Sequence, residues 1–188
     1  MKISSKSIKL GEGDSSFTSE VKARSGQNPS RCMQCGKCTA GCPVGFSADL
    51  PVNAVLRLVQ EGLRDEVLGS RFIWLCAQCR TCSVRCPQEI DVAALMGTLR
   101  TMAWKGGHVA DKRVKVFLGA FVDSVRKHGR VHELGLMMEY ALRTGRLFDE
   151  LELAPKALGK LSLRPHASLG ADEVCAIVER AMKKGEDR

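Results

Sequence analysis

The chain has 188 residues, of which 44 % are hydrophobic but only 5 % aromatic, and its formal net charge is +8. It starts without an apolar signal core and contains no uninterrupted apolar run of about 18 residues, so we expect a cytoplasmic protein without a membrane span. The basic residues are scattered through helical patterns rather than gathered in one block, which argues against nucleic-acid binding. Nine cysteines in a reducing compartment indicate metal binding or catalysis.

The first half of the chain is predicted to be helical. Phe17 and Val21 fall on one face of a short helix that Gly26 closes. Pro51 opens a further helix, whose apolar residues recur at helical spacing: Val52, Val55, Leu56, Val59 and Leu63. Asp91 is the expected N-cap of a helix that stops at the glycine pair 106–107.

The second half is also predicted to be helical. A helix is expected from about residue 109 to residue 127, and its predicted core face consists of Val114, Phe117, Leu118, Phe121 and Val125. Another helix is expected near residues 133–143, ending at Gly145. Residues 151–170 contain two prolines and are expected to be extended, and an apolar stripe from Val174 to Met182 then predicts a C-terminal helix. That helix either folds back on the body or docks a partner. Because no segment shows sustained period-two alternation, the predicted fold class is all-α.

Two cysteine arrays repeat the same spacing 44 positions apart: RCMQCGKCTAGCPV at 31–44 and LCAQCRTCSVRCPQ at 75–88. Each reads C-x₂-C-x₂-C-x₃-C-P, the run that binds [4Fe–4S] clusters in ferredoxins. In two-cluster ferredoxins the cysteine before the proline binds the other array's cluster. This rule assigns Cys32, Cys35, Cys38 and Cys86 to one cluster, and Cys76, Cys79, Cys82 and Cys42 to a second.

Structural zinc is the alternative to iron, because two C-x₂-C units can form a tetrahedral site. Zinc needs only four ligands, however, whereas here a third cysteine and a Cys-Pro pair recur at the same offsets in both arrays. We therefore expect two [4Fe–4S] clusters on loops between helices. The ninth cysteine, Cys175, falls on an apolar helical face and is expected to serve packing.

The two arrays differ at positions that could tune the clusters. Thr39 and Ser83 place a hydroxyl at equivalent positions, whereas Arg80 and Arg85 replace two glycines of the first array. Nearby cations favour the reduced, more negative state of a cluster. The hypothesis is that the second cluster has the higher potential and forms the exit of a relay. The alternative is that both arginines point into solvent or form salt bridges with a partner.

The arrays and the stretches AVLRLVQEGL, EVLGSRFIWLCAQCRTCSVRCP, EIDVAAL and GKLSLRPH resemble the α-helical ferredoxin domain, and more closely the family of heterodisulfide reductase C subunits. The resemblance covers residues 14–170. It implies cluster ligation by the eight cysteines. It also implies that single electrons pass from a flavin-containing, iron–sulfur partner, the A-type component, to a catalytic B-type component with Cys-Cys-Gly motifs. The B-type component reduces the CoM-S-S-CoB heterodisulfide in anaerobic methanogenesis. A hydrogenase or formate dehydrogenase is a candidate further component of such a complex.

The expected organisation has four parts: an N-terminal segment with a short helix (1–26), a two-cluster α-helical ferredoxin core (27–106), additional packed helices (107–145), and an extended arm with the C-terminal helix (146–188). The chain has neither an adjacent cysteine pair nor a glycine-rich nucleotide fingerprint. We therefore predict an electron-relay subunit of an oxidoreductase acting on a disulfide, without catalytic residues or a substrate site of its own. The alternatives are a relay in another anaerobic respiratory or sulfur-metabolism complex, and a structural or regulatory iron–sulfur module.

Overall fold

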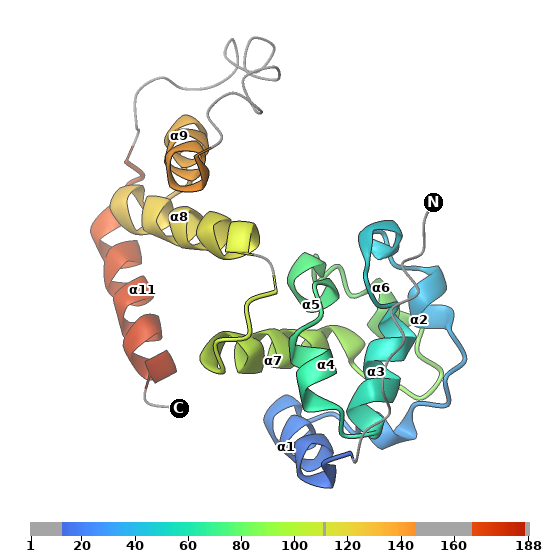
Figure 1. The fold of residues 1–188 in the computed structure, drawn as a ribbon. Helices are drawn as coiled ribbons and strands as arrows, with labels where there is room; N and C mark the ends of the chain where they lie inside the picture. Colours follow the sequence, from blue (N-terminus) through green and yellow to red (C-terminus); the bar gives the residue numbers. More distant parts are fainter. Residues whose placement is uncertain (1–12, 111, 146–166, 187–188) are drawn as a thin grey trace. The chain divides into compact units, whose positions relative to one another are not determined.

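The computed structural model describes residues 13–110, 112–145 and 167–186, and within these ranges the chain forms helices and no strands (Figure 1). The all-α prediction is therefore confirmed. The chain divides into two compact units, Met1–Asp111 and Lys112–Arg188. Both cysteine arrays lie in the first unit.

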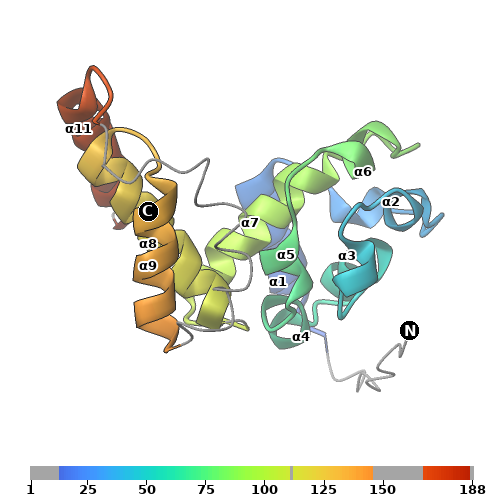
Figure 2. The ribbon, with the colours of Figure 1, turned by 90° about the horizontal axis from the view of Figure 1, so that it is seen from above.

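The first unit is built from short and medium helices that alternate with the cysteine loops. In chain order these are α1 (Ser15–Ser25), η1 (Pro29–Arg31), α2 (Lys37–Ala40), η2 (Gly45–Ser47), α3 (Val52–Gln60), α4 (Arg64–Leu68), α5 (Phe72–Leu75), α6 (Thr81–Val84) and α7 (Val92–Lys105). The short helices α2 and α6 each lie within one array and contact each other (Figures 1 and 2). This contact brings the two arrays together.

The helix ends follow the capping signals in the sequence. The Asp14 carboxylate accepts a hydrogen bond from the Ser16 N–H at the start of α1, and Gly26 ends that helix in a left-handed conformation with φ 67°. The Asp91 carboxylate caps α7 by accepting from the Ala94 N–H at 3.1 Å. The predicted closure at Gly26 and the predicted cap at Asp91 are confirmed.

The core of the first unit lies around α7, which contacts α1, α4, α5 and α6. Its fully buried large side chains come from five helices and the loop before α7: Phe17, Leu56, Leu68, Phe72, Ile73, Ile90, Leu95, Met96 and Leu99. Burying side chains of this size stabilises the fold by about 1.5–3 kcal/mol each. This apolar core fixes α3 and α7, the two helices that follow the arrays.

The second unit contains α8 (Lys112–His128), α9 (Glu133–Thr144) and α11 (Ala171–Glu186), with α8 in contact with both other helices. α8 begins three residues later than expected, and its predicted core face is partly wrong. Its buried residues are Ala120 and Ser124, whereas Phe117 and Phe121 are 42 % and 39 % exposed. α11 packs on α8 within its own unit, and most of the predicted extended arm, residues 146–166, lies outside the described residues.

Candidate metal centres

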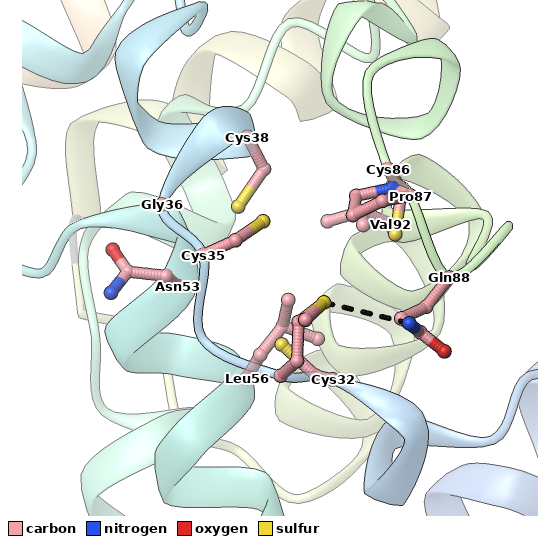
Figure 3. Close-up of a pocket in the computed structure, with 11 residues that line it drawn as sticks. Cys32, Cys35, Gly36, Cys38, Asn53, Leu56, Cys86, Pro87, Gln88 and Val92 are labelled. Atoms are coloured by element: carbon pink, nitrogen blue, oxygen red, sulfur yellow. Dashed lines mark hydrogen bonds between the residues drawn. The ribbon is translucent and has the colours of Figure 1, made fainter.

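The first cavity, of about 330 Å³ including its open mouth, brings cysteines of both arrays together. It is lined by Cys32, Met33, Cys35, Gly36, Cys38, Asn53, Leu56, Cys86, Pro87, Gln88 and Val92. Figure 3 shows Cys35 and Cys38 on one side and Cys86 on the other. Three thiols therefore come from the first array and the fourth from the second.

The second cavity, of about 370 Å³ including its mouth, has the opposite composition. Cys76, Cys79 and Cys82 of the second array line it together with Cys42 of the first. Its apolar wall is formed by Val44, Val52, Phe72, Ala93 and Met96. Each cavity thus contains one of the two cysteine sets expected from the spacing.

The two loops follow the same backbone path. Gln34 and Gln78 both have positive φ, at 58° and 55°. Gly36 and Arg80 also share the left-handed region, with φ of 74° and 62°. An arginine in this conformation costs about 1 kcal/mol relative to a glycine. The spacing of the cysteines therefore corresponds to one turn geometry used twice.

Thr39 and Ser83 attach each array to the helix that follows it. The Asn53 N–H donates to Thr39 Oγ1 at 3.0 Å, and the Ala93 N–H donates to Ser83 Oγ at 3.0 Å. Both hydroxyls therefore bond to the first turn of a helix, α3 in one case and α7 in the other. Their role in tuning cluster potentials stays a prediction.

The two arginines of the second array lie on the surface. Arg80 is 68 % exposed and forms a salt bridge with Asp91 at 2.7 Å. Arg85 is exposed and lies over Gly41, where a Cβ would approach Arg85 Nη1 to 2.5 Å. The positive charge of Arg80 is thus paired with a carboxylate of its own chain.

Burial raises the pKa of the Cys38 and Cys82 thiols, of which Cys38 is buried and Cys82 half-buried. Hydrogen bonds with Thr39 and Ser83 act in the opposite direction. Metal coordination requires thiolates. Iron would supply the positive charge that these two positions need.

The cysteine sets fit [4Fe–4S] clusters. Each cavity offers four thiols, and no histidine or carboxylate lines either one. Four cysteine ligands are the usual set for this cluster. Within the described ranges, no three His, Cys, Asp or Glu side chains are grouped as they would be around a single ion. Cys175 belongs to α11 of the second unit, where its Sγ lies 3.7 Å from Glu179 Oε1.

Each array has a further polar residue hydrogen-bonded to the backbone carbonyl of its first cysteine. Sequence patterns identify neither residue. Gln60 at the end of α3 donates to the Cys32 carbonyl at 2.9 Å. Arg100 in α7 donates to the Cys76 carbonyl. A polar residue within an amphipathic helix carries no signal by itself, so only the folded structure reveals these contacts.

Comparison with known proteins agrees with this geometry. Residues 28–90 match the family described as the 4Fe-4S dicluster domain. The chain is also 34 % identical to an iron-sulfur C subunit of the CoB–CoM heterodisulfide reductase of Methanocaldococcus jannaschii, over 68 % of this chain and 73 % of that protein. The chain belongs to the family of heterodisulfide reductase C subunits.

Other members of this family show the same relationship. The C subunit of the H(2):CoB-CoM heterodisulfide,ferredoxin reductase from Methanothermobacter thermautotrophicus is 29 % identical over 80 % of both chains. The iron-sulfur C subunit of the CoB–CoM heterodisulfide reductase from Methanopyrus kandleri is 38 % identical over 42 % of this chain and 41 % of its own. The protein is thus an iron–sulfur subunit of the [4Fe–4S] type. Across the described parts of the chain, no helix has the length and apolar character to cross a membrane.

Proposed function

We propose that this chain is the electron-relay subunit of a cytoplasmic heterodisulfide reductase and that it holds two [4Fe–4S] clusters. Cys32, Cys35, Cys38 and Cys86 bind one cluster, and Cys42, Cys76, Cys79 and Cys82 bind the other. The chain takes single electrons from a flavin-containing A-type component and passes them to a catalytic B-type component. The latter reduces the disulfide of coenzyme M and coenzyme B.

The observation that carries this proposal is the crosswise lining of the two cavities. Each contains three cysteines of one array and the fourth of the other. The contact between α2 and α6 keeps the arrays side by side, as electron transfer between two centres requires. A protein that used one cluster only as a structural brace would need just one of these sites.

The chain's own residues hold and shield the two centres. Leu56 and Val92 contribute apolar surface to the first cavity, and Phe72 and Met96 to the second. Cys35 and Cys79 are exposed, whereas Cys38 is buried. Each centre thus has an apolar inner wall and an exposed edge, from which electrons can pass to a neighbouring protein.

The ligand assignment is tested by exchanging cysteines for serine in the anaerobically purified full chain. The parent is expected to contain about eight irons and eight sulfides. Cys86→Ser should alter the EPR signal of the same centre as Cys35→Ser and leave the centre altered by Cys79→Ser unchanged. If Cys86→Ser instead alters the Cys79 centre, each array binds its own cluster and the crosswise assignment is wrong.

The partners are tested by anaerobic purification from native cells, followed by mass spectrometry. Recovery with a flavoprotein and a protein that contains Cys-Cys-Gly motifs supports the heterodisulfide pathway, as does heterodisulfide-dependent oxidation of the reduced clusters. Recovery with a membrane cytochrome or an unrelated dehydrogenase would contradict this assignment. It would move the same relay to another anaerobic respiratory complex.

A further inference from the structure

The two arrays and the helices that follow them form an internal repeat. α3 follows the first array, and the Asn53 N–H in its first turn donates to Thr39 Oγ1. α7 follows the second array, and the Ala93 N–H in its first turn makes the equivalent hydrogen bond to Ser83 Oγ. Residues 53 and 93 are therefore equivalent, which gives an offset of 93 − 53 = 40 along these helices. Gln60 is thus the counterpart of Arg100.

Gln60 and Arg100 make the same pair of backbone contacts. Gln60 Nε2 donates to the carbonyls of Pro29 at 3.0 Å and Cys32 at 2.9 Å. Arg100 Nε donates to the carbonyl of Ile73 at 2.8 Å, and its Nη2 donates to that of Cys76. In each array the acceptors are the first cysteine and the residue three positions before it.

The two contacts differ in charge. Gln60 is neutral, whereas Arg100 brings a full positive charge to the first cysteine of the second array. Arg100 is half-buried, and no carboxylate forms an ion pair with it in the ranges the structure describes. A partly buried charge is screened by solvent much less than an exposed one.

We propose that Arg100 raises the reduction potential of the second cluster, held by Cys42, Cys76, Cys79 and Cys82, above that of the first. This inference rests on the two clusters of the proposed function. Reduction from [4Fe–4S]²⁺ to [4Fe–4S]⁺ adds one electron and one negative charge, which a nearby cation stabilises. Gln60 provides the same hydrogen bonds at the first cluster without the charge.

The other cations near the cavities are exposed to solvent, which weakens their effect. They are Arg31 and Lys37 in the first array, and Arg71, Arg80 and Arg85 in or just before the second. Arg80 is in addition paired with Asp91. Cations of this kind therefore occur at both clusters, whereas a half-buried arginine bonded to a cysteine carbonyl occurs at the second.

Hydrogen bonds to sulfur also raise cluster potentials, and they are balanced between the arrays. Gln34 Nε2 lies 3.4 Å from Cys32 Sγ in the first array. Thr81 Oγ1 lies 3.4 Å from Cys79 Sγ in the second. Thr39 and Ser83 add a second equivalent pair of contacts, to Cys38 and Cys82. Because these contacts occur in both arrays, the charge of Arg100 is the main asymmetry. Electrons thus enter at the first cluster and leave from the second, which holds them more tightly.

The test is an EPR-monitored anaerobic redox titration of the full chain with both clusters bound. Arg100→Gln reproduces the arrangement already present at Gln60, and Arg100→Lys keeps the charge. We expect Arg100→Gln to lower the reduced-to-oxidised ratio of the second cluster about tenfold at the parent's midpoint, which is about 59 mV for one electron. Arg100→Lys should retain more than half of that difference.

The matched control is Arg57→Gln, which removes the same charge from an exposed arginine paired with Glu61 on α3. It should move neither midpoint as far as Arg100→Gln does. Cys79→Ser and Cys35→Ser identify which signal belongs to which cluster. Iron content and the number of reducible centres are measured first. A chain with one centre or none contradicts the proposed function, and a chain with two centres tests Arg100 separately.

Two results would overturn the inference: a change no larger than that of Arg57→Gln, or a larger change at the first cluster than at the second. If the Arg100→Gln variant fails to bind both clusters, the Gln60→Lys variant tests the effect of the charge instead. This substitution adds a charge at the equivalent position, and it should raise the potential of the first cluster. An unchanged or lowered first potential would then reject the role of charge at this position.

Discussion

Asp91 connects the second array to the helix behind it. Its carboxylate accepts hydrogen bonds from Ser83 Oγ at 2.7 Å and from the Ala94 N–H at 3.1 Å, and it pairs with Arg80. The pKa of Asp91 is lowered, first by the Ser83 hydrogen bond and then by the Ala94 N–H, with a smaller effect of Arg80. One carboxylate thus caps α7, orients Ser83 and neutralises an arginine beside the second cavity.

Replacing Asp91 with alanine is expected to reduce the free energy of unfolding by about 1–2 kcal/mol, the usual cost of losing an N-cap. Because the folded pKa is depressed, the stabilisation is complete above the unfolded pKa of about 3.9 and is lost only as the pH falls through the folded value. The loss should therefore be the same at pH 6 and pH 8. Anaerobic denaturation followed by circular dichroism measures it.

The control for this substitution is Asp65→Ala, which changes an exposed carboxylate in the first turn of α4. It should cost less than Asp91→Ala, because no capping hydrogen bond is lost. An effect of Asp91→Ala that grows between pH 6 and pH 8 would contradict the depressed pKa. An effect no larger than that of Asp65→Ala would contradict the capping role.

At the scale of elements, α1 is held against the end of α3 by a close approach of two backbones. The Asp14 N–H donates to the Gly62 carbonyl at 3.2 Å. A Cβ at Gly62 would lie 2.4 Å from the Asp14 carbonyl oxygen and 2.6 Å from its nitrogen. Gly62 also has φ +71°, so it needs both left-handed backbone and an absent side chain.

Gly62→Ala is expected to destabilise the protein by about 3 kcal/mol or more, because left-handed strain adds to a clash with backbone that cannot yield. Gly26→Ala is the matched control. Gly26 has nearly the same φ, +67°, but nothing lies within 4 Å of its Cβ position. It should cost only about 1 kcal/mol of strain. Equal losses for the two variants in anaerobic thermal melts would refute the close approach.

The sequence predicts many of these elements, because their signals are local. Gly26, Asp91 and Gly145 mark helix ends by their own backbone or capping chemistry, and the structure ends or begins helices there. The spacing within one loop likewise predicts three thiols of each set, whereas the fourth comes from the other array and was expected from the rule for two-cluster ferredoxins.

The structural equivalence of Gln60 and Arg100 was not predictable in the same way. The cysteines repeat at an offset of 44 residues, whereas α3 and α7 repeat at an offset of 40. The segment between Cys42 and α3 is longer than that between Cys86 and α7, and it includes η2 (Gly45–Ser47). Aligning the sequence by its cysteines therefore places Gln60 opposite Trp104 and hides the equivalence.

The face of α8 shows another limit of sequence patterns. Its apolar residues recur at helical spacing, which predicts a buried stripe, but Phe117 and Phe121 are exposed and contact each other with ring centroids 6.4 Å apart. Phe117 also meets Tyr140 of α9 edge-on. Periodicity shows which side of a helix is apolar, but not how much of that side its neighbours cover.

At the scale of the whole molecule, the two units depend on iron to different degrees. All eight array cysteines lie in the first unit, in loops and in the one-turn helices α2 and α6. The second unit is held by contacts of α8 with α9 and α11. Cluster binding should therefore be coupled to folding of the first unit and not of the second.

Removing iron with a chelator under anaerobic conditions is expected to increase hydrogen exchange at least tenfold in both arrays and in the first turns of α3 and α7. The amides of α8 and α9 should keep their protection. Hydrogen–deuterium exchange with mass spectrometry resolves these segments. The same increase in both units would show that they fold as one cooperative body, and no change in the arrays would show that they are rigid without metal.

The crosswise lining of the cavities also bears on how the chain could be divided. Neither cavity can be completed by the residues before α4 alone or by those after it alone. Gly69, between α4 and α5, is exposed and lines neither cavity. A chain cleaved there would form two fragments joined by two inorganic bridges, and each fragment could assemble its centres only with a copy of the other. Two clusters bound in this way would make the two halves of the first unit obligate complements.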